Sequence, residues 1–257
     1  MIQSVQRAVQ ILRELARSGR LGVTELAERI EVAKPTAHSM LRTLESEGLV
    51  VQDHESSKYA LGPGLVYLGN AYLDGHELRT RSLTWADGLA TRVKEAVWVG
   101  VRAGDHVLVV HHVFRPEGAV QILEVGATIP WNTCALGKAI VAFGPEPVEA
   151  DLLNGKLAVL TGASLTDPVT LGEQLADVRR TGYAIEDQEC ALGDAGIAAP
   201  VLDRSGEVAG AIGVVGAVER LLAKGTREAI AVAVRETARN LSRDLGAGRG
   251  YTRRAAG

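Results

Sequence analysis

The chain has 257 residues, 46% of them hydrophobic and 23% charged, with a formal net charge of -3. This length allows one small and one larger domain with a proper hydrophobic core, and the acidic balance excludes a protein that coats nucleic acid without regard to sequence. The two cysteines, Cys134 and Cys190, are too few for a disulfide framework and favour a reducing cytoplasm. No signal peptide and no apolar run of membrane-spanning length is evident, so we expect a cytoplasmic protein with no membrane partner.

The first sixty residues predict a small helical domain with a two-stranded wing. Apolar residues recur at helical spacing over residues 5–15, which predicts a first helix. Thr24 can cap a second helix, and Pro35 suits the first turn of a third helix that ends at Gly48. Residues 49–61 predict two short strands joined by a polar turn. Helix, turn, helix and wing in this order are typical of a winged helix-turn-helix domain that binds double-stranded DNA.

The predicted third helix has an apolar stripe on one side and hydroxyl and guanidinium groups on the other. Such a polar face can meet base edges and phosphates when a helix enters the major groove. We expect Arg42 and Ser39 to lie nearest the base edges, with Lys34, Thr36 and Lys58 nearest the phosphates. The full set of residues that we expect to bind DNA is Lys34, Pro35, Thr36, His38, Ser39, Arg42, Thr43 and Lys58.

The same residues are compatible with a small helical hairpin whose polar face meets only water. Residues 1–62 carry eight Lys and Arg against eight Asp and Glu, which counts against DNA because the phosphate backbone dominates affinity. We therefore expect the carboxylates to face away from the duplex and two copies of the domain to contribute to the affinity for DNA. The carboxylates concerned are those of Glu25, Glu28, Glu31, Glu45 and Glu47.

Beyond the wing, the pattern predicts a linker and a second domain. From Ala96 the apolar period shortens from that of a helix to that of a strand, and Gly104 with Asp105 predicts a hairpin. Further strands are predicted at 120–125, 197–202 and 208–215, and helices after Thr133, weakly at 145–160, from Asp167 to Gly182 and at 227–245. A mixed sheet flanked by helices fits this order, so the predicted fold class is α+β. The predicted divisions are 1–62, a linker helix region at 63–85, the second domain at 86–246 and a disordered tail at 247–257.

Signals of catalysis and of metal binding are poor. Gly137 and Lys138 lack the hydroxyl and the upstream glycine of a phosphate loop. His111 and His112 point to opposite faces of a strand, which disfavours a metal site. Cys134 has no identifiable basic partner and is interpreted as a packing residue rather than a nucleophile. We expect no catalytic residue, metal or cofactor, against two alternatives: a small enzyme with an N-terminal partner-binding module, and a protein-interaction module that does not bind DNA.

Four segments together resemble the IclR family of bacterial transcription regulators. They read KPTAHSMLRTLESEGLV in the helix-turn-helix, KYALG at the end of the wing, TCALGKAI at a helix start and GYAIEDQECALGDAGIAAPVLD late in the chain. The resemblance implies a winged helix-turn-helix domain, a linker helix and a GAF-like domain that binds a small effector. It also implies a homodimer or homotetramer on a palindromic operator, and no enzymatic activity.

The resemblance also implies an effector pocket built from two parts of the chain. Matching motif by motif, its residues are Thr133, Cys134, Ala135, Leu136, Glu186, Glu189, Gly196 and Val215. Glu186 stands where the family usually has Asp, while Gly196 and Val215 stand where polar residues are common. From the residues alone, the acidic cluster at 186–189 is interpreted as a solvated turn. The helix start near Thr133 offers backbone N–H groups to an anionic or hydroxylated ligand.

Shorter strings resemble the glycerol-operon regulators within that family. They are AYLDGHELRTRSLTW, VHHVFRP, LEVGA, GAVERL and SRDLGAG. This narrower resemblance makes glycerol or glycerol 3-phosphate the expected effector and repression of a carbon-catabolism operon the expected function. The alternatives are a regulator of another small-molecule or aromatic-acid pathway, and an activator.

Overall fold

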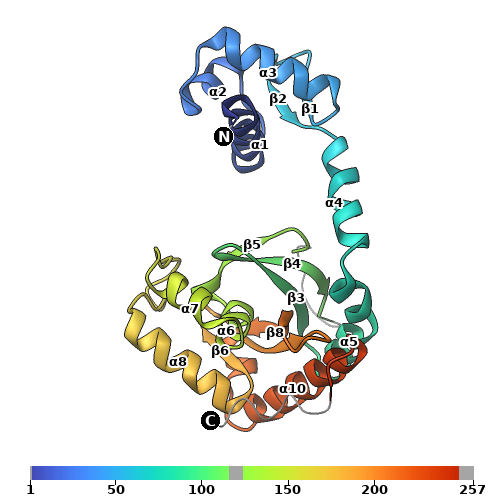
Figure 1. Ribbon diagram of the computed structural model, residues 1–257, viewed down its shortest axis with the longest axis vertical. Helices are drawn as coiled ribbons and strands as arrows, with labels where there is room; N and C mark the ends of the chain where they lie inside the picture. The colour runs from blue at the N-terminus through green and yellow to red at the C-terminus, as the bar shows by residue number, and fades with distance from the viewer. Residues whose placement is uncertain (1, 116–123, 249–257) are drawn as a thin grey trace. The chain divides into compact units, whose positions relative to one another are not determined.

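A computed structural model describes residues 2–115 and 124–248 of the chain (Figure 1). The chain divides into two compact units, Met1–Gly75 and His76–Gly257. None of the helices in the described residues combines the length and the apolar composition needed to cross a membrane.

The first unit is a helix-turn-helix followed by a two-stranded hairpin and a further helix. Its elements are α1 (Gln3–Ser18), α2 (Val23–Arg29), α3 (Lys34–Ser46), β1 (Val50–Gln52), β2 (Tyr59–Leu61) and α4 (Gly64–Asp74). The strands pair antiparallel, and Leu21 forms a bridge to Tyr59 that ties the wing to the end of α1. One core holds the three helices and the wing together: Ile11, Leu15, Leu21, Leu26, Ile30, Leu41, Leu44, Val50 and Tyr59. The predicted helix-turn-helix and wing are confirmed.

The cap of α2 differs from the prediction. The N-cap residue is Gly22, and Thr24 lies inside the first turn. The backbone N–H of Gly22 donates to the Glu25 carboxylate at 2.8 Å, so an acidic side chain at the third position satisfies this helix end. The expectation that Thr24 caps the helix was therefore wrong.

The second unit contains one six-stranded sheet with the strand order β5-β4-β3-β8-β7-β6. All described pairings in it are antiparallel, so the expectation of a mixed sheet was wrong. The strands are β3 (Ala96–Ala103), β4 (His106–Val113), β5 (Thr128–Pro130), β6 (Ala184–Asp187), β7 (Asp194–Leu202) and β8 (Val208–Ala217). The predicted hairpin between Ala103 and His106 is confirmed.

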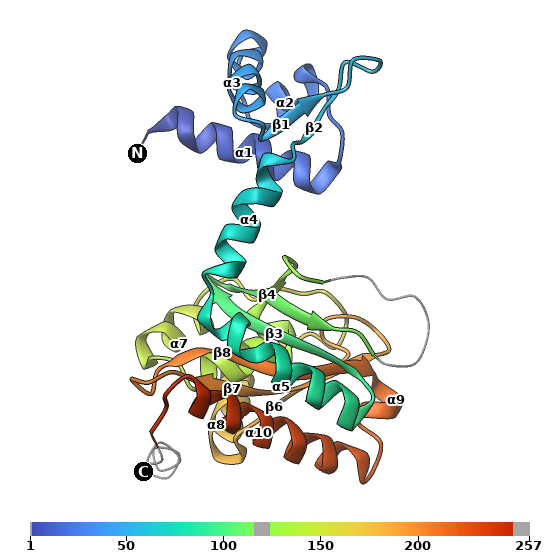
Figure 2. The same ribbon diagram turned by 90° about the vertical axis from the view of Figure 1, so that its right-hand side faces the viewer.

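Helices cover both faces of this sheet (Figures 1 and 2). One face carries α5 (Glu77–Val93) and α10 (Thr226–Asp244), and the other carries α6 (Ala135–Ala142) with α7 (Glu146–Leu153) and α8 (Pro168–Thr181) packed beside it. Two short helices remain, the 3-10 turn η1 (Trp131–Thr133) and α9 (Val218–Leu221). Side chains of α6 and α8 form the core on their face with small residues such as Ala198 and Ala211 of the sheet. The predicted α+β class is confirmed.

Three further predictions for this unit concern a strand, the tail of the chain and a helix cap. The expected strand at 120–125 falls partly outside the described residues, and Glu124 and Val125 are not in a strand. Residues 249–257 of the expected disordered tail also lie outside the described residues. Asp167 caps α8 as expected, because its carboxylate accepts from the Thr170 N–H at 2.8 Å.

We predict that Gly213→Ala destabilises the second unit. A Cβ at Gly213 would lie 2.7 Å from the Cβ of Ala198 and 2.8 Å from the Ile197 carbonyl oxygen, which belong to the neighbouring strand. Such overpacking lowers the free energy of unfolding by about 1–3 kcal/mol, measurable by urea denaturation. Gly88→Ala is the matched control, because its Cβ meets nothing within 4 Å and alanine favours a helix interior. Equal stability of the two variants would contradict the prediction.

Candidate functional site

The eight residues expected to bind DNA form an exposed surface on the first unit. Seven lie on α3 from Lys34 to Thr43, and Lys58 lies in the turn of the wing; all eight are exposed. Ala37, Leu41 and Leu44 occupy the opposite, buried side of α3. No side chain caps the first turn of α3. Pro35 has no N–H and the Thr36 N–H donates to the Ala33 carbonyl at 2.9 Å, so Lys34 is the residue of this turn whose backbone N–H can face a phosphate.

Two carboxylates of this unit are engaged within the protein. Glu25 accepts from the Gly22 N–H at the start of α2, and Glu45 accepts from the Gln52 N–H of β1 at 3.2 Å. Both side chains are exposed and keep their negative charge, but each is held against the backbone of its own unit. These contacts fix where two of the eight acidic charges of residues 1–62 lie.

The eight residues of the expected effector site come from α6 and from three adjacent strands. Glu186 of β6, Gly196 of β7 and Val215 of β8 are register partners, so they form one row across the sheet. Residues 133–136 are buried at the start of α6, on the same side of the sheet. A Cβ on Gly196 would lie 3.3 Å from the Ala135 Cβ and 3.4 Å from Glu186 Oε2. The fold therefore brings both parts of the predicted site together.

Cys134, and not Thr133, caps helix α6. The Gly137 N–H donates to the Cys134 Sγ at 3.3 Å, whereas the Thr133 hydroxyl donates to the Pro130 carbonyl at 3.1 Å. The chain makes a 3-10 turn before α6, so the helix cap lies one residue beyond the predicted one. Burial raises the pKa of the Cys134 thiol to about 12, so the thiol stays protonated.

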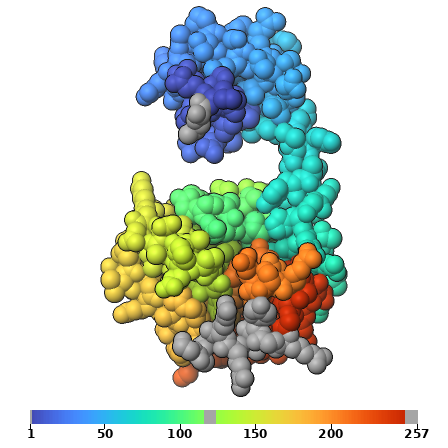
Figure 3. Space-filling view, viewed as in Figure 1, coloured from blue at the N-terminus to red at the C-terminus, as the bar shows by residue number. Residues whose placement is uncertain are grey.

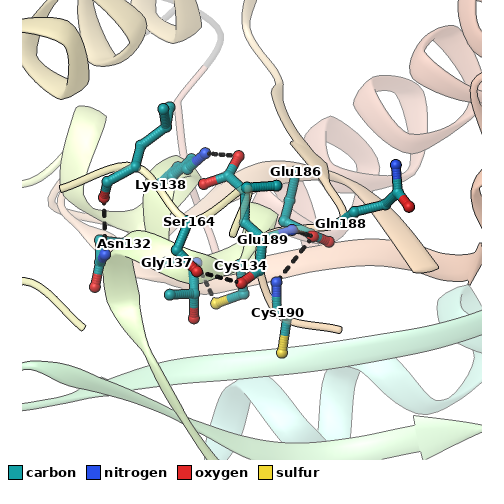
Figure 4. A network of polar contacts seen from close by, with 12 residues as sticks. Asn132, Cys134, Gly137, Lys138, Ser164, Glu186, Gln188, Glu189 and Cys190 are labelled. Carbon is teal, nitrogen blue, oxygen red and sulfur yellow. Dashed lines mark hydrogen bonds and ion pairs between the residues drawn. The ribbon is translucent and has the colours of Figure 1, made fainter. Parts of the chain in front are cut away.

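A buried ion pair joins α6 to the segment that follows β6. Lys138 Nζ lies 2.5 Å from Glu189 Oε1, and both side chains are almost completely shielded from solvent. The second carboxylate oxygen of Glu189 is buried and has no hydrogen-bond partner in residues 2–115 and 124–248. We name Cys134, Lys138, Glu186, Glu189 and Cys190 the buried polar cluster (Figure 4). The sequence contains a signal for this pair: Lys138 is the one charged residue of an otherwise apolar helix. A charge in a buried helix needs a partner of opposite charge.

Glu186 is buried, so the interpretation of residues 186–189 as a solvated turn was wrong. Its Oε1 accepts from the backbone N–H groups of Glu189 at 2.6 Å and Cys190 at 3.1 Å (Figure 4). Burial nevertheless raises the pKa of Glu186 to about 7, against the lowering effect of these two hydrogen bonds. The carboxyl can therefore be neutral near physiological pH and can then donate a hydrogen bond.

Two departures from the pattern that the resemblance implies are neighbours in the sheet, because Glu186 and Gly196 are register partners. A Cβ added at Gly196 would be in van der Waals contact with Glu186 Oε2 at 3.4 Å. The carboxyl of Glu186 therefore lies beside the bare backbone of β7 at this position.

Trp98 and His112 lie on the same face of the sheet but do not belong to the predicted effector site. They are register partners on β3 and β4, and their rings meet edge to face at 5.8 Å. The Glu124 N–H donates to His112 Nδ1 at 3.2 Å. Trp98 Nε1 and His112 Nε2 are buried and have no hydrogen-bond partner among the residues that the structure describes. Within residues 2–115 and 124–248, no three His, Cys, Asp or Glu side chains are placed to hold a metal ion.

We predict that Glu186→Gln flattens the dependence of stability on pH. The pKa of Glu186 is about 7 in the folded protein, above its ordinary value of 4.5. Between these values the folded state keeps a proton that the unfolded state has lost, so this stability is present below about pH 4.5 and is lost as the pH rises through 7. The loss is on the order of 3 kcal/mol.

Urea denaturation at about pH 5 and about pH 8 measures this difference. Wild type should lose more stability between the two conditions than Glu186→Gln, whereas the exposed Glu173→Gln should keep the wild-type dependence. Parallel curves for wild type and Glu186→Gln would contradict the prediction.

Comparisons with known proteins agree with this arrangement. The family model "IclR helix-turn-helix domain" matches residues 4–54, and "Bacterial transcriptional regulator IclR C-terminal" matches residues 70–243. The glycerol operon regulatory protein of Streptomyces griseus is 46% identical over 250 residues, which are 96% of this chain and 98% of that protein. Its counterpart from Streptomyces coelicolor is 45% identical with the same coverage. A crystal structure of an IclR transcriptional regulator from Alicyclobacillus acidocaldarius has a TM-score of 0.82 at 29% identity and covers 96% of this chain and 100% of that chain. The chain therefore belongs to the IclR family of transcriptional regulators and is not an enzyme.

Proposed function

We propose that the protein represses a carbon-catabolism operon, one for glycerol use, and that a small polyol effector controls its binding to a palindromic operator. The similarity to two glycerol operon regulatory proteins over nearly the whole chain carries this proposal. A repressor of this kind acts in the cytoplasm, where its operator lies. The exposed polar face of α3 is the surface that supports operator binding.

The first unit exposes apolar surface that a second copy can cover. Helix α4 has no buried residue, and Val66, Tyr67 and Leu68 are each more than half exposed. Figure 3 shows the side chains of this helix, in cyan, uncovered on the face in view. Exposed apolar helices of this kind are typical of association surfaces. Two copies joined here form the proposed homodimer, and two such dimers a homotetramer.

The buried polar cluster suits an uncharged polyol. Glu186, when neutral, can donate to a hydroxyl, and Glu189 Oε2 is an acceptor without a partner among the described side chains and backbone groups. Two carboxyl groups disfavour an added phosphate, because like charges at short range raise the cost of burial. Of the two effectors considered, glycerol therefore fits the cluster better than glycerol 3-phosphate.

We predict that Arg42→Ala weakens operator binding. A bidentate arginine contact to a base contributes about 1–3 kcal/mol of discrimination, so the affinity should fall by about tenfold to a hundredfold. Fluorescence anisotropy with promoter DNA from upstream of the protein's own gene measures the change. Arg102→Ala, an exposed arginine of the second unit, makes the same change of charge and should leave affinity intact. Unchanged affinity in Arg42→Ala would show that this residue does not contact the operator.

We predict that Val215→Ser increases sensitivity to glycerol without changing operator affinity in its absence. Val215 is half-buried beside Gly196, and a serine there adds a hydroxyl partner for the polyol. One net hydrogen bond corresponds to a shift of about twofold to tenfold in the glycerol concentration that releases half of the operator. Val169→Ser is the matched control on the exposed side of α8. Identical release curves for Val215→Ser and Val169→Ser would show that Val215 does not contact the effector.

A further inference from the structure

A cavity lies at the edge of the sheet, away from the buried polar cluster. It has a volume of about 790 Å³ and is lined by β7 and by parts of α6, α8 and α10. Strand β6 pairs with β7 only as far as Ala184 and Ala198, so the next residues of β7 have no partner strand on this side within the described chain. None of the eight residues expected to bind the effector lines this cavity.

The described lining of this cavity carries five arginines and no acidic residue. They are Arg179 and Arg180 at the end of α8, and Arg235, Arg239 and Arg243 on α10. The three on α10 are four residues apart and share one side of the helix. Like charges at this spacing destabilise a helix, so the arrangement has an energetic cost that an anion would offset. We name these five residues the arginine cavity.

Helix dipoles account for only some of these charges. Arg179, Arg180 and Arg243 lie in the last turns of their helices, where cations are stabilised by the negative end of the helix. Arg235 and Arg239 lie further from the end of α10, where this effect has faded. Their positions therefore need another explanation.

Ion pairs within the chain engage two other arginines of the cavity but not Arg235 and Arg239. Arg179 pairs with Glu149 at 2.7 Å, and Arg180 pairs with Asp177 at 2.9 Å. By contrast, within the described part of the chain the Nε of Arg235 is buried without a hydrogen-bond partner, and Arg239 forms no ion pair. A buried donor without a partner is costly, which indicates that a ligand completes it.

The shape and the donors favour a small phosphorylated molecule. A guanidinium group can donate two parallel hydrogen bonds to the oxygens of one phosphate. The volume of the cavity lies in the range of sites that bind small molecules. The open edge of β7 does not suit an added peptide strand, because Pro200 lacks an N–H and the Leu202 N–H already donates to the Ser242 hydroxyl at 2.9 Å. We propose that the arginine cavity is a second ligand site, which binds the phosphoryl group of a small metabolite through Arg235 and Arg239.

Isothermal titration calorimetry on the full chain tests this site, with inorganic pyrophosphate and glycerol 3-phosphate as probes at constant chloride concentration. We expect both probes to bind wild type and to bind Arg235→Gln/Arg239→Gln more weakly by about tenfold or more, since hydrogen bonds to charged groups are lost. Arg239→Gln alone changes an exposed side chain and should show the same direction if the double variant is unstable.

Lys224→Gln/Arg227→Gln is the matched control, because it removes two exposed positive charges at the start of the same helix. Wild-type affinity in this control supports a built site. Absence of binding to wild type, equal affinity in the cavity variants, or an equal loss in the control would each overturn the proposal. Glu186→Gln should leave probe binding unchanged, which separates this site from the proposed glycerol site.

Discussion

The buried ion pair between Lys138 and Glu189 is the constraint on which the second unit depends. Lys138 is fully buried in a helix. It requires an opposite charge nearby, because leaving a buried charge unpaired destabilises a protein by about 3–5 kcal/mol. Glu189 meets this need only if the segment after β6 folds over α6. Glu186 fixes that segment by accepting two of its backbone N–H groups, and Ser164 donates to the Glu189 carbonyl at 2.8 Å. One ion pair thus orders the helix, the strand end and a nearby loop together.

The first unit shows how a neutral domain can present a surface for an anionic duplex. Two of its carboxylates accept hydrogen bonds from backbone N–H groups: Glu25 at the start of α2 and Glu45 beside β1. Its exposed α3 face keeps lysine, arginine and hydroxyl groups. Salt screens the attraction between protein charges and DNA phosphates beyond about 10 Å. The position of each charge on the domain therefore matters more for DNA binding than the net charge. The composition of residues 1–62 was therefore a poor guide to its partner.

Local patterns in the sequence were sufficient for most elements. The helical period of α1, the turn at Gly104 and the Asp167 cap of α8 depend on neighbours within a few residues, so they could be predicted. The exposed polar face of α3 was predictable for the same reason, because an exposed helix face follows from one apolar stripe. The residues of the predicted effector site came from the family resemblance rather than from their own pattern, since their contacts join segments about fifty residues apart.

The sequence by itself determined the α+β class, the winged helix-turn-helix and the membership of a regulator family. Only the tertiary structure decided that Glu186 is buried rather than solvated, that Cys134 caps α6, and that the sheet is antiparallel throughout. The pairing of Lys138 with Glu189, the facing of Trp98 and His112, and the gathering of arginines from α8 and α10 also required it. These features depend on contacts between residues far apart in the chain, which local spacing does not encode.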